Sequence, residues 1–265
     1  KDKQSYKLIH GSWTGHQHLS IVNQKWHGTY LVQAPSNAIQ AIKVELDDNW
    51  QFHSWVVYPK HGAALNAQQK RLRDHLNVWL DQPIGRFSKA IWPEDKLKMA
   101  LNGSSIADFF NRVQLWASHA DLSCTALPNE LRGFDSHVTV RDVVASYVYA
   151  NTIVVLDVTG KVLRQALEQC AKYFDVNQKG HVTIAESFLK PKEQHYNYDY
   201  FSGIQYTFDL SQEENHRVVK LCWHGQPVLD DQHLKLAMCN YRATGAGDFD
   251  MYLQCPRVEE IQTEI

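Results

Sequence analysis

The sequence of 265 residues lacks any apolar run that approaches the length of a membrane span, which argues against a membrane partner. Cysteine is also scarce: there are five, an odd number at wide spacing, and no Cys-x-x-Cys pair. This pattern excludes a disulfide framework and the usual zinc or redox motifs. We therefore expect buried free thiols in a reducing compartment, which favours the cytoplasm. We expect the chain to begin inside a domain, so an exported location of the intact protein stays open.

The chain has little excess charge of either sign, since 27 Lys and Arg against 29 Asp and Glu give a formal net charge of −2. The basic residues are spread along the sequence, and the longest cluster, residues 70–73, is best explained as a solvated helix face. Nothing in this balance favours a nucleic-acid polymer as partner. A hydrophobic content of 44% is enough for one large or two modest domains.

Residues 1–60 alternate short β-rich runs with turns. Period-two alternation over residues 50–58 predicts that Trp50, Phe52 and Ser54 share one face of a strand. Strands without neighbours expose unpaired edges, which invite pairing with another chain. A dimer formed through such edges is therefore one expectation.

Residues 61–88 change to a helical period and predict a linker helix that ends at Gln82 and Pro83. The apolar positions at helical spacing are Leu65, Leu72, Leu76, Trp79 and Leu80. A second helix is predicted to begin with Ser104 or Ser105 as its N-cap, and core packing best explains its apolar stripe.

Residues 89–265 predict a compact unit in which strands and helices are mixed. Residues 152–158 form a β-branched strand, and Thr159 is expected to cap the helix that follows. Further strands are predicted over residues 204–210, 217–223 and 234–240. Because the order of the elements is mixed, the expected fold class is α+β.

Two histidines, His16 and His18, stand two residues apart behind Gly15. In an extended or tightly turned backbone, residues i and i+2 point the same way, so both imidazoles can face one metal or two neighbouring metals. Many such pairs simply lie on one face of a strand. A structural or adventitious metal site is a third interpretation, and the pair alone leaves all three open.

Several independent motifs follow one another along the chain. The turn Thr14-Gly15-His16-Gln17-His18 comes first, followed by strand-like segments at residues 28–37 and 41–46. The later motifs lie at residues 121–127, 140–144, 149–152, 157–161, 195–200, 203–207 and 240–245. Together they resemble the 5'-nucleotidase and 2',3'-cyclic-nucleotide 2'-phosphodiesterase family, in which a calcineurin-like metallophosphatase domain precedes a nucleotide-binding domain. The resemblance covers the chain from about Thr14 to its C-terminus.

The resemblance implies three parts. Residues 1–60 correspond to the last strands of a metallophosphatase β-sandwich, residues 61–88 to the linker helix, and residues 89–265 to the C-terminal substrate-binding domain. It also implies that His16 and His18 are ligands of a dinuclear centre of Mn, Zn, Co or Mg ions, which clamps a phosphate and activates water.

The family carries three further metal-binding motifs ahead of this histidine pair: Asp-x-His, Gly-Asp-x-x-Asp and Gly-Asn-His-Asp/Glu. Residues 1–14 contain none of them. Two imidazoles leave most coordination positions of a dinuclear centre empty. We therefore expect weak or absent metal binding and no phosphatase activity from this chain alone.

The resemblance further implies a clamp for a nucleobase. Tyr149 and Tyr241 occupy the places of the two family aromatics that sandwich the base, and each precedes a turn from which a ring can project. Asn151 corresponds to an amide that hydrogen-bonds the base edge, although it can equally serve as a turn residue.

Three further residues correspond to positions near the sugar and the phosphate. Arg132 stands where relatives carry a phosphate-binding arginine, although Pro128 and Glu130 replace part of the family's glycine-rich loop. Asp248 lies one position later than the family's ribose-binding aspartate, so it either reaches the sugar or caps the turn. Arg242 either pairs with an acid such as Asp248 or attracts the anionic substrate.

The intact protein is therefore expected to hydrolyse nucleoside monophosphates or 2',3'-cyclic nucleotides with the help of two metal ions, and this chain supplies the nucleotide-binding part. Family members rotate the second domain about the linker helix to carry substrate to the metals. The alternative is a non-catalytic module that binds a nucleotide or nucleoside.

Overall fold

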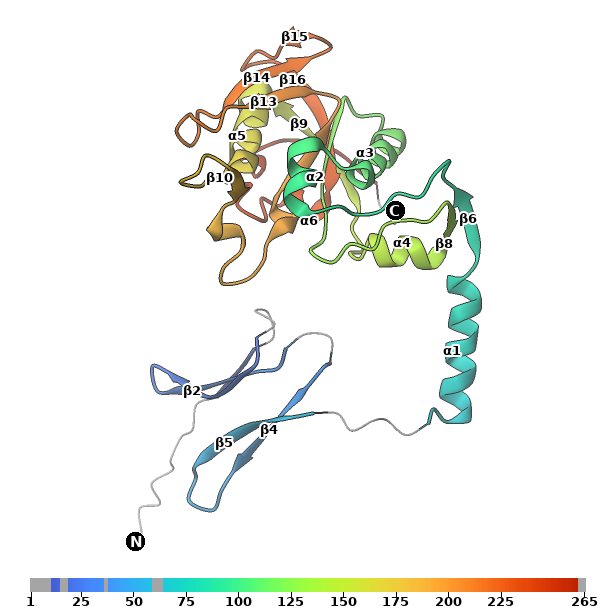
Figure 1. Ribbon diagram of the computed structural model, residues 1–265, viewed down its shortest axis with the longest axis vertical. Helices are drawn as coiled ribbons and strands as arrows, with labels where there is room; N and C mark the ends of the chain where they lie inside the picture. Colours follow the sequence, from blue (N-terminus) through green and yellow to red (C-terminus); the bar gives the residue numbers. More distant parts are fainter. Residues whose placement is uncertain (1–10, 15–18, 36–37, 59–63, 262–265) are drawn as a thin grey trace. The chain divides into compact units, whose positions relative to one another are not determined.

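The computed structural model describes residues 11–14, 19–35, 38–58 and 64–261. The chain divides into two compact units, Lys1–Leu72 and Arg73–Ile265, and Figure 1 labels many of their helices and strands. Within the described ranges, every helix is too short or too polar to cross a lipid bilayer.

Unit 1 consists of short strands paired in two small sheets. β1 (Gly11–Thr14) runs parallel to β3 (Thr29–Gln33), and β3 runs antiparallel to β2 (Ile21–Trp26). β4 (Ala41–Leu46) forms an antiparallel pair with β5 (Phe52–Val57). The β-rich pattern of the first 60 residues therefore corresponds to real strands in the described ranges.

A polar bridge and an aromatic pair join the two small sheets. The backbone N–H of Asn23 donates to Oγ of Ser54 at 2.7 Å, and Phe52 stacks on Tyr30 with ring centroids 4.2 Å apart. Phe52 and Ser54 are buried, as the period-two pattern predicts. The prediction was wrong for Trp50, which is 60% exposed, because it lies in the turn before β5 with a φ of +60°.

The predicted linker helix corresponds to α1 (Ala67–Leu80). Asn66 and Gln69 cap its start reciprocally, since each backbone N–H donates to the other side chain, at 3.0 and 2.9 Å. The helix ends before Pro83, whose ring would clash with a continuing helix.

The segment that follows α1 is fixed to the body of unit 2. β6 (Pro83–Arg86) pairs antiparallel with β8 (His137–Thr139). The guanidinium of Arg141 donates to Oδ1 of Asp81 at 2.8 Å and to Oδ1 of Asn77 at 3.1 Å. These contacts hold the last turn of α1 on unit 2.

A five-stranded sheet forms the centre of unit 2, in the order β12-β7-β16-β9-β17. Its strands are β7 (Leu122–Ala126), β9 (Ile153–Thr159), β12 (Asp199–Ser202), β16 (His233–Cys239) and β17 (Arg257–Ile261). β7 and β16 are parallel, whereas the other neighbours are antiparallel. A mixed sheet with helices on its faces confirms the expected α+β class.

The two long helices of this unit begin at the predicted caps. Oγ of Ser104 accepts the backbone N–H of Ala107 at the start of α3 (Ser105–Ser118). The hydroxyl of Thr159 does the same for α5 (Gly160–Ala171). Both side chains satisfy backbone donors that a helix start otherwise leaves without a partner.

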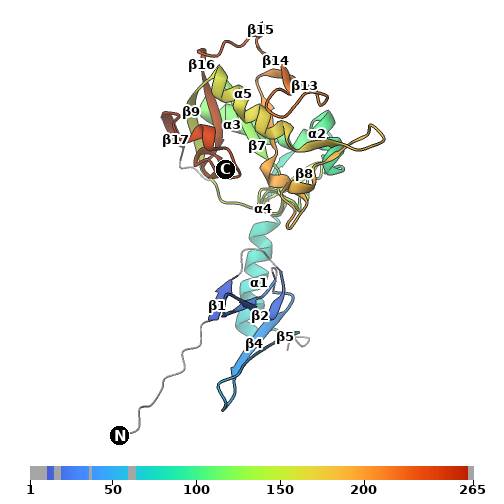
Figure 2. The ribbon, with the colours of Figure 1, turned by 90° about the vertical axis from the view of Figure 1, so that its left-hand side faces the viewer.

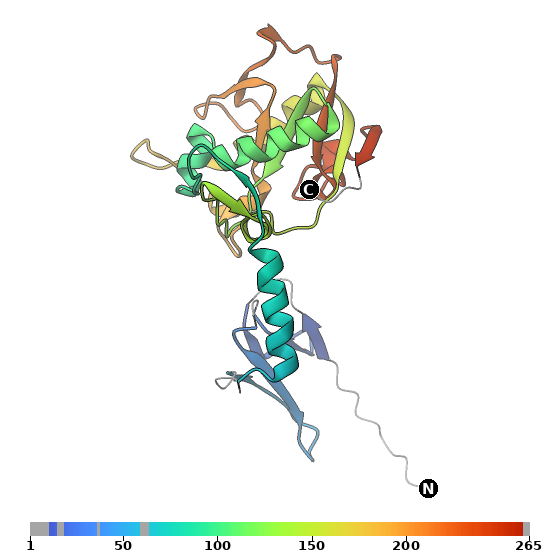
Figure 3. The same cartoon turned by 90° about the vertical axis from the view of Figure 1, so that its right-hand side faces the viewer.

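The helices α3 and α5 cover opposite faces of the sheet, as Figures 2 and 3 show from either side. Along β9, Val154, Leu156 and Val158 pack into the core that contains the apolar stripe of α5. Ile153 and Val155 point the other way and pack with Ala117 of α3. This alternation follows from the period of two along a strand.

Smaller elements complete unit 2. The remaining strands are β10 (Phe174–Val176), β11 (Val182–Ile184), β13 (Gln205–Phe208), β14 (Val218–Trp223) and β15 (Gln226–Pro227). The remaining helices are α2 (Lys96–Asn102), α4 (Val140–Ser146), α6 (Asn240–Ala243) and the 3-10 turns η1 (Glu186–Phe188), η2 (His195–Asn197) and η3 (Asp250–Tyr252). The predicted strands over 204–210, 217–223 and 234–240 match β13, β14 and β16 to within two residues.

All five cysteines are free. Cys124, Cys170 and Cys222 are buried, whereas Cys239 and Cys255 are half-buried. Burial raises the pKa of the Cys124 and Cys170 thiols, so both stay protonated at neutral pH.

Candidate functional site

The two predicted clamp tyrosines lie near the same end of two adjacent strands of the central sheet, β9 and β16. β9 and β16 are antiparallel, with Ile153 opposite Cys239, and the backbone N–H of Asn240 donates to the carbonyl of Thr152 at 2.9 Å. The start of β9 and the end of β16 therefore meet. Tyr149 lies four residues before β9 and is 57% exposed, and Tyr241 lies two residues after β16 and is 50% exposed.

The loop that carries Tyr149 is short and braced. The backbone N–H of Asn151 donates to the carbonyl of Tyr149 at 2.9 Å, which closes a tight turn directly after the tyrosine. Burial raises the pKa of the neighbouring Tyr147 phenol, and a hydrogen bond with the Asn151 side chain acts in the opposite direction. Asn151 is half-buried, and its side-chain amide supports the turn through the hydrogen bond with Tyr147.

A hydrogen bond connects this loop to the loop that carries Arg132. Oγ of Ser146, at the end of α4, donates to the carbonyl of Gly133 at 2.8 Å and is fully buried. The Arg132 side chain is 54% exposed, and its nearest acid is Asp142, with Nη2 and Oδ1 3.9 Å apart. Such a distant pair leaves the guanidinium able to bind an anion.

Gly133 fixes the shape of the Arg132 loop. Its φ is +85°, and a Cβ at this position would lie 2.6 Å from the carbonyl oxygen of Ile91. The backbones of Ile91 and Phe134 exchange two hydrogen bonds at 2.8 and 2.9 Å. Only glycine fits this close approach, so the loop holds its course although it lacks the family's run of glycines.

The backbone of Tyr241 is held by the side chains of two neighbouring residues, Asn240 and Thr244. The backbone N–H of Tyr241 donates to Oδ1 of Asn240 at 2.9 Å, and the hydroxyl of Thr244 donates to the carbonyl of Tyr241 at 2.7 Å. Gly245 and Gly247 both have positive φ, 79° and 75°, which lets the chain reverse direction within a few residues.

Arg242 is buried under this loop, with 2% exposure. Its Nε and Nη2 atoms each lie 2.9 Å from an oxygen of Asp199 on β12, a bidentate pair. Nη2 also donates to the carbonyl of Tyr196 at 2.9 Å, and Nη1 donates to the carbonyl of Ala246. Burial alone would lower the pKa of Arg242, but the charge and hydrogen bonds of Asp199 outweigh burial and raise it.

These contacts correct the predicted partner of Arg242. The expected acid was Asp248, whereas the structure pairs Arg242 with Asp199. Phe249 covers the guanidinium, with Cζ 4.1 Å from the ring centroid. In this structure the Arg242 guanidinium therefore faces the protein interior.

The position of Asp248 follows from the glycine before it. A Cβ on Gly247 would collide with Oδ1 of Asn197 and Nη1 of Arg242, so no larger residue fits at position 247 without a shift. The carboxylate is carried by Asp248 instead, which is exposed and has a φ of +67°.

Asp248 borders a polar hollow of about 510 Å³. Arg217, Glu186 and Asn197 also line this hollow, and Oδ1 of the buried Asn197 has no hydrogen-bond partner in the described part of the chain. Neither clamp tyrosine lines it. The structure thus places Tyr149, Asn151 and Tyr241 near the adjacent ends of β9 and β16, whereas Asp248 lines a separate hollow.

The predicted metal ligands His16 and His18 lie outside the described residues. Among the residues that are described, no three His, Cys, Asp or Glu side chains cluster in a way that could hold a metal ion.

Two residues without a predicted role shape this region, Asp199 and Ser146. Asp199 is a single acid inside the aromatic run of residues 198–201, a pattern that indicates a buried carboxylate in need of a cationic partner but does not identify that partner. Ser146 leaves no such signal, because its partner is a backbone carbonyl.

The chain matches the family model of the 5'-nucleotidase C-terminal domain over residues 83–254. It is 32% identical over 225 residues to a 2',3'-cyclic-nucleotide 2'-phosphodiesterase/3'-nucleotidase of Haemophilus influenzae. That alignment covers 70% of this chain but 33% of the relative. The chain thus spans about a third of the length of this curated relative.

Solved structures give the same result. A Staphylococcus aureus protein described as a 5'-nucleotidase, solved in complex with alpha-ketoglutarate, superposes with a TM-score of 0.85 at 31% identity, over 97% of this chain and 51% of that one. A 5'-nucleotidase precursor from Thermus thermophilus shares the fold, with a TM-score of 0.56 at 17% identity over 95% of this chain and 54% of that one. The chain therefore belongs to the 5'-nucleotidase family, and residues 83–254 match the C-terminal domain of that family.

Proposed function

We propose that this chain binds the nucleotide of a phosphoesterase reaction by holding the base between Tyr149 and Tyr241. The observation that carries the proposal is that both exposed tyrosines lie near the adjacent ends of two neighbouring strands, β9 and β16. A flat base offers two apolar faces, and stacking on an aromatic ring contributes roughly 1–3 kcal/mol per base.

The anchoring of both loops supports this role, because a preorganised site loses less conformational entropy on binding. The Tyr241 loop rests on the buried pair of Arg242 and Asp199. The Tyr149 loop is tied to its neighbour through Ser146. Two half-exposed rings on firmly held backbones suit a ligand that slides between them.

Polar groups around the clamp fit the rest of a nucleotide. The exposed guanidinium of Arg132 suits a phosphate, since its planar fork makes two parallel hydrogen bonds. Asn151 offers an amide to the base edge, in addition to its bond with Tyr147. The exposed carboxylate of Asp248 is a candidate acceptor for ribose hydroxyls, with capping of its own turn as the competing role.

We further propose that the intact protein hydrolyses nucleoside monophosphates or 2',3'-cyclic nucleotides. Two relatives support this step by name: the Haemophilus influenzae protein is a 2',3'-cyclic-nucleotide 2'-phosphodiesterase/3'-nucleotidase, and the Staphylococcus aureus protein is described as a 5'-nucleotidase. His16 and His18 would be ligands in a dinuclear centre that supplies the activated water. This chain's own proposed task is to hold the base, the sugar and the phosphate.

Calorimetric titration of adenosine and AMP into tyrosine variants tests the clamp. Tyr149→Ala and Tyr241→Ala should each weaken binding by roughly 1–3 kcal/mol, whereas Phe at either position keeps the aromatic face and should change it little. Circular dichroism melts establish that the variants are folded. Unchanged dissociation constants in both folded Ala variants would contradict the proposed clamp.

A further inference from the structure

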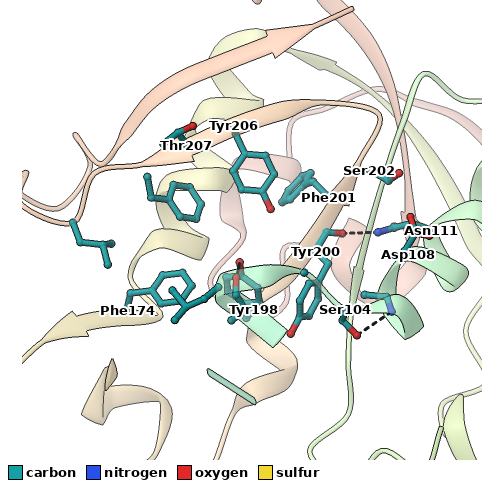
Figure 4. Close-up of a pocket in the computed structure, with 16 residues that line it drawn as sticks. Ser104, Asp108, Asn111, Phe174, Tyr198, Tyr200, Phe201, Ser202, Tyr206 and Thr207 are labelled. Atoms are coloured by element: carbon teal, nitrogen blue, oxygen red, sulfur yellow. Dashed lines mark hydrogen bonds between the residues drawn. The ribbon is translucent and has the colours of Figure 1, made fainter. Parts of the chain in front are cut away.

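A second hollow of about 500 Å³ lies in unit 2, apart from the proposed base clamp. It opens between α2 and the first turns of α3 on one side and β12 and β13 on the other (Figure 4). Neither Tyr149 nor Tyr241 lines it. Its volume falls within the range of about 300–1,000 Å³ that small-molecule sites occupy.

Six aromatic side chains form a continuous wall along this hollow, and two of them, Phe174 and Tyr198, are almost entirely buried. Each ring touches the next, in the order Tyr200, Tyr198, Phe174, Phe208, Tyr206 and Phe201. The successive ring centroids are 5.0, 5.6, 6.2, 5.2 and 6.2 Å apart. In Figure 4 the hydroxyl of Tyr206 points into the space between these rings.

Two hydrogen bonds tie the wall to α2 and α3. Nδ2 of the buried Asn111 donates to the carbonyl of Tyr200 at 2.8 Å. The hydroxyl of Tyr198 donates to the carbonyl of Ala100 at 3.1 Å. These bonds fix the backbone at Tyr200 and the ring of Tyr198, which favours a preformed site.

The charge of the hollow has one sign. Of the sixteen residues that line it, Asp108 alone has a side chain that is charged at neutral pH. Burial raises the pKa of the lining phenols, that of Tyr206 to about 12, so they stay neutral. The Asp108 carboxylate is exposed and has no hydrogen bond or ion pair with any described residue.

The start of α3 faces the same space and contributes about half a positive charge from the helix dipole. The full negative charge of Asp108 in that first turn exceeds this contribution. With no Lys, Arg or His in the lining, the hollow stays net negative and is unsuited to phosphate.

We propose that this hollow binds a small organic cation, an amine or quaternary ammonium compound, at a site separate from the nucleotide. Aromatic faces carry negative charge, and a cage of several rings is the usual protein receptor for ammonium groups that lack hydrogen-bond donors. The carboxylate of Asp108 complements the same charge at the rim. Neutral aromatic compounds would use the rings but gain nothing from Asp108.

Choline and its uncharged isostere 3,3-dimethylbutan-1-ol are the probes, titrated into the 265-residue chain by saturation-transfer NMR and calorimetry. Choline should bind roughly three- to thirty-fold more tightly than the isostere, which matches the usual strength of cation–π contacts. Choline methyl groups should show intermolecular NOEs to the rings of Tyr206 and Phe201. Equal affinity for the two probes, or no choline binding at millimolar concentrations, overturns the proposal.

Matched variants locate the site. Asp108→Asn should weaken choline roughly two- to five-fold and leave the isostere unchanged, whereas Asp231→Asn, at an exposed acid outside the hollow, should change neither. Tyr206→Phe keeps the aromatic face and should keep binding, and Tyr206→Leu should weaken it. If Tyr206→Leu unfolds the chain, the Asp108 pair and the NOEs still decide. Choline affinity that is indifferent to Asp108→Asn, with no NOE to either ring, means that the site is elsewhere and the proposal fails.

Discussion

Arg242 shows most clearly how a single side chain organises the proposed site. Its guanidinium has four hydrogen bonds to three different segments, which converge beneath the loop of Tyr241. Removing one member of a buried ion pair leaves the other charge buried without a partner, at a typical cost of about 3–5 kcal/mol.

Arg242→Met should therefore lower the free energy of unfolding by about 3–5 kcal/mol in urea titrations. Adenosine and AMP should lose affinity equally in the folded fraction, because the loop rather than a phosphate contact is disturbed. The double variant Asp199→Leu with Arg242→Met removes both charges and should recover part of the stability. A selective loss of AMP affinity with stability intact would instead indicate that Arg242 contacts the phosphate.

The partner of Arg242 could not be read from the sequence. Asp248 is six positions away and was the natural local choice, whereas Asp199 lies 43 positions upstream on a different strand. Local patterns carry no information on which strand becomes the neighbour at such separation. By contrast, the exposure of Tyr149 and Tyr241 follows from local signals, since both stand at the end of a strand or helix before a turn.

His195 gives a pH dependence at the same scale. Its Nδ1 lies 2.6 Å from the hydroxyl of Tyr173, and Glu193 is 3.9 Å from Nε2. Burial and then the charge of Lys96 lower the pKa of His195, against smaller opposite effects of Glu193 and Asp95. The folded pKa is thus below the unfolded value of about 6.5, so the unfolded state takes up a proton first.

The free energy of unfolding should therefore fall as the pH drops below about 6.5, toward the lower folded pKa of His195. The loss of stability ends at the pH where His195 is protonated in both the folded and the unfolded state. His195→Gln keeps a hydrogen-bonding side chain near Tyr173 but cannot titrate, so its stability should be less dependent on pH over this interval. Urea unfolding from pH 7.5 to 5 measures both slopes. Equal slopes would exclude His195 as the titrating group.

At the scale of elements, α4 is the connection between two proposed binding loops. It begins with a capping box of Thr139 and Asp142, near Arg132, and ends at Ser146, three residues before Tyr149. The hydroxyl of Ser146 then closes the path by binding Gly133. The short helix α4 thus sets the spacing between Arg132, the candidate phosphate-binding residue, and Tyr149, a candidate base-binding residue.

Ser146→Ala should cost about 1–3 kcal/mol of stability, because it leaves the carbonyl of Gly133 without its buried donor. Arg132 is the neighbour of Gly133, so loss of this hydrogen bond should displace Arg132. AMP, which carries a phosphate, should therefore lose more affinity than adenosine. Thermal melts and paired titrations measure both effects, with Ser20→Ala at an exposed serine as the control. Equal losses for the two ligands would show that the tether does not position Arg132.

The elements themselves were largely predictable from local rules. The caps Ser104 and Thr159, the end of α1 before Pro83, and the strands near 204–210 and 217–223 follow from hydroxyl caps, proline and period-two alternation. The prediction for Trp50 was wrong because the boundary of a strand depends on where the preceding turn closes. Here the backbone N–H of Trp50 closes that turn by donating to the carbonyl of Asp47. The order of the strands in the central sheet also required the tertiary fold.

At the scale of the whole molecule, the boundary between the two compact units falls after Leu72, within the sequence of α1. The division into a metallophosphatase remnant, a linker helix and a substrate-binding domain, with boundaries at residues 60 and 88, stays a prediction. Family membership was accessible from the sequence, because many separated motifs recur in one order and the family model covers residues 83–254.

The whole chain should bind nucleotides without hydrolysing them. Of the metal ligands implied by the family resemblance, residues 1–18 provide His16 and His18, too few for a dinuclear centre. We expect no release of phosphate from AMP and no opening of 2',3'-cyclic AMP with added Mn²⁺, Co²⁺ or Zn²⁺. Turnover on the usual enzyme scale of about 1–10³ per second would contradict this expectation. Calorimetric binding of adenosine in the same preparation is the control for folding.

One edge strand belongs to two proposed sites at once. β12 contributes Asp199, which anchors the loop of Tyr241, and also Tyr200 and Phe201, which line the aromatic hollow. Local opening of this edge would loosen both places together. A ligand that binds only the closed edge at either site therefore raises affinity at the other by the same factor, because a coupling free energy is reciprocal. If both proposed sites bind their ligands, β12 would couple the binding of an ammonium compound to the binding of a nucleotide.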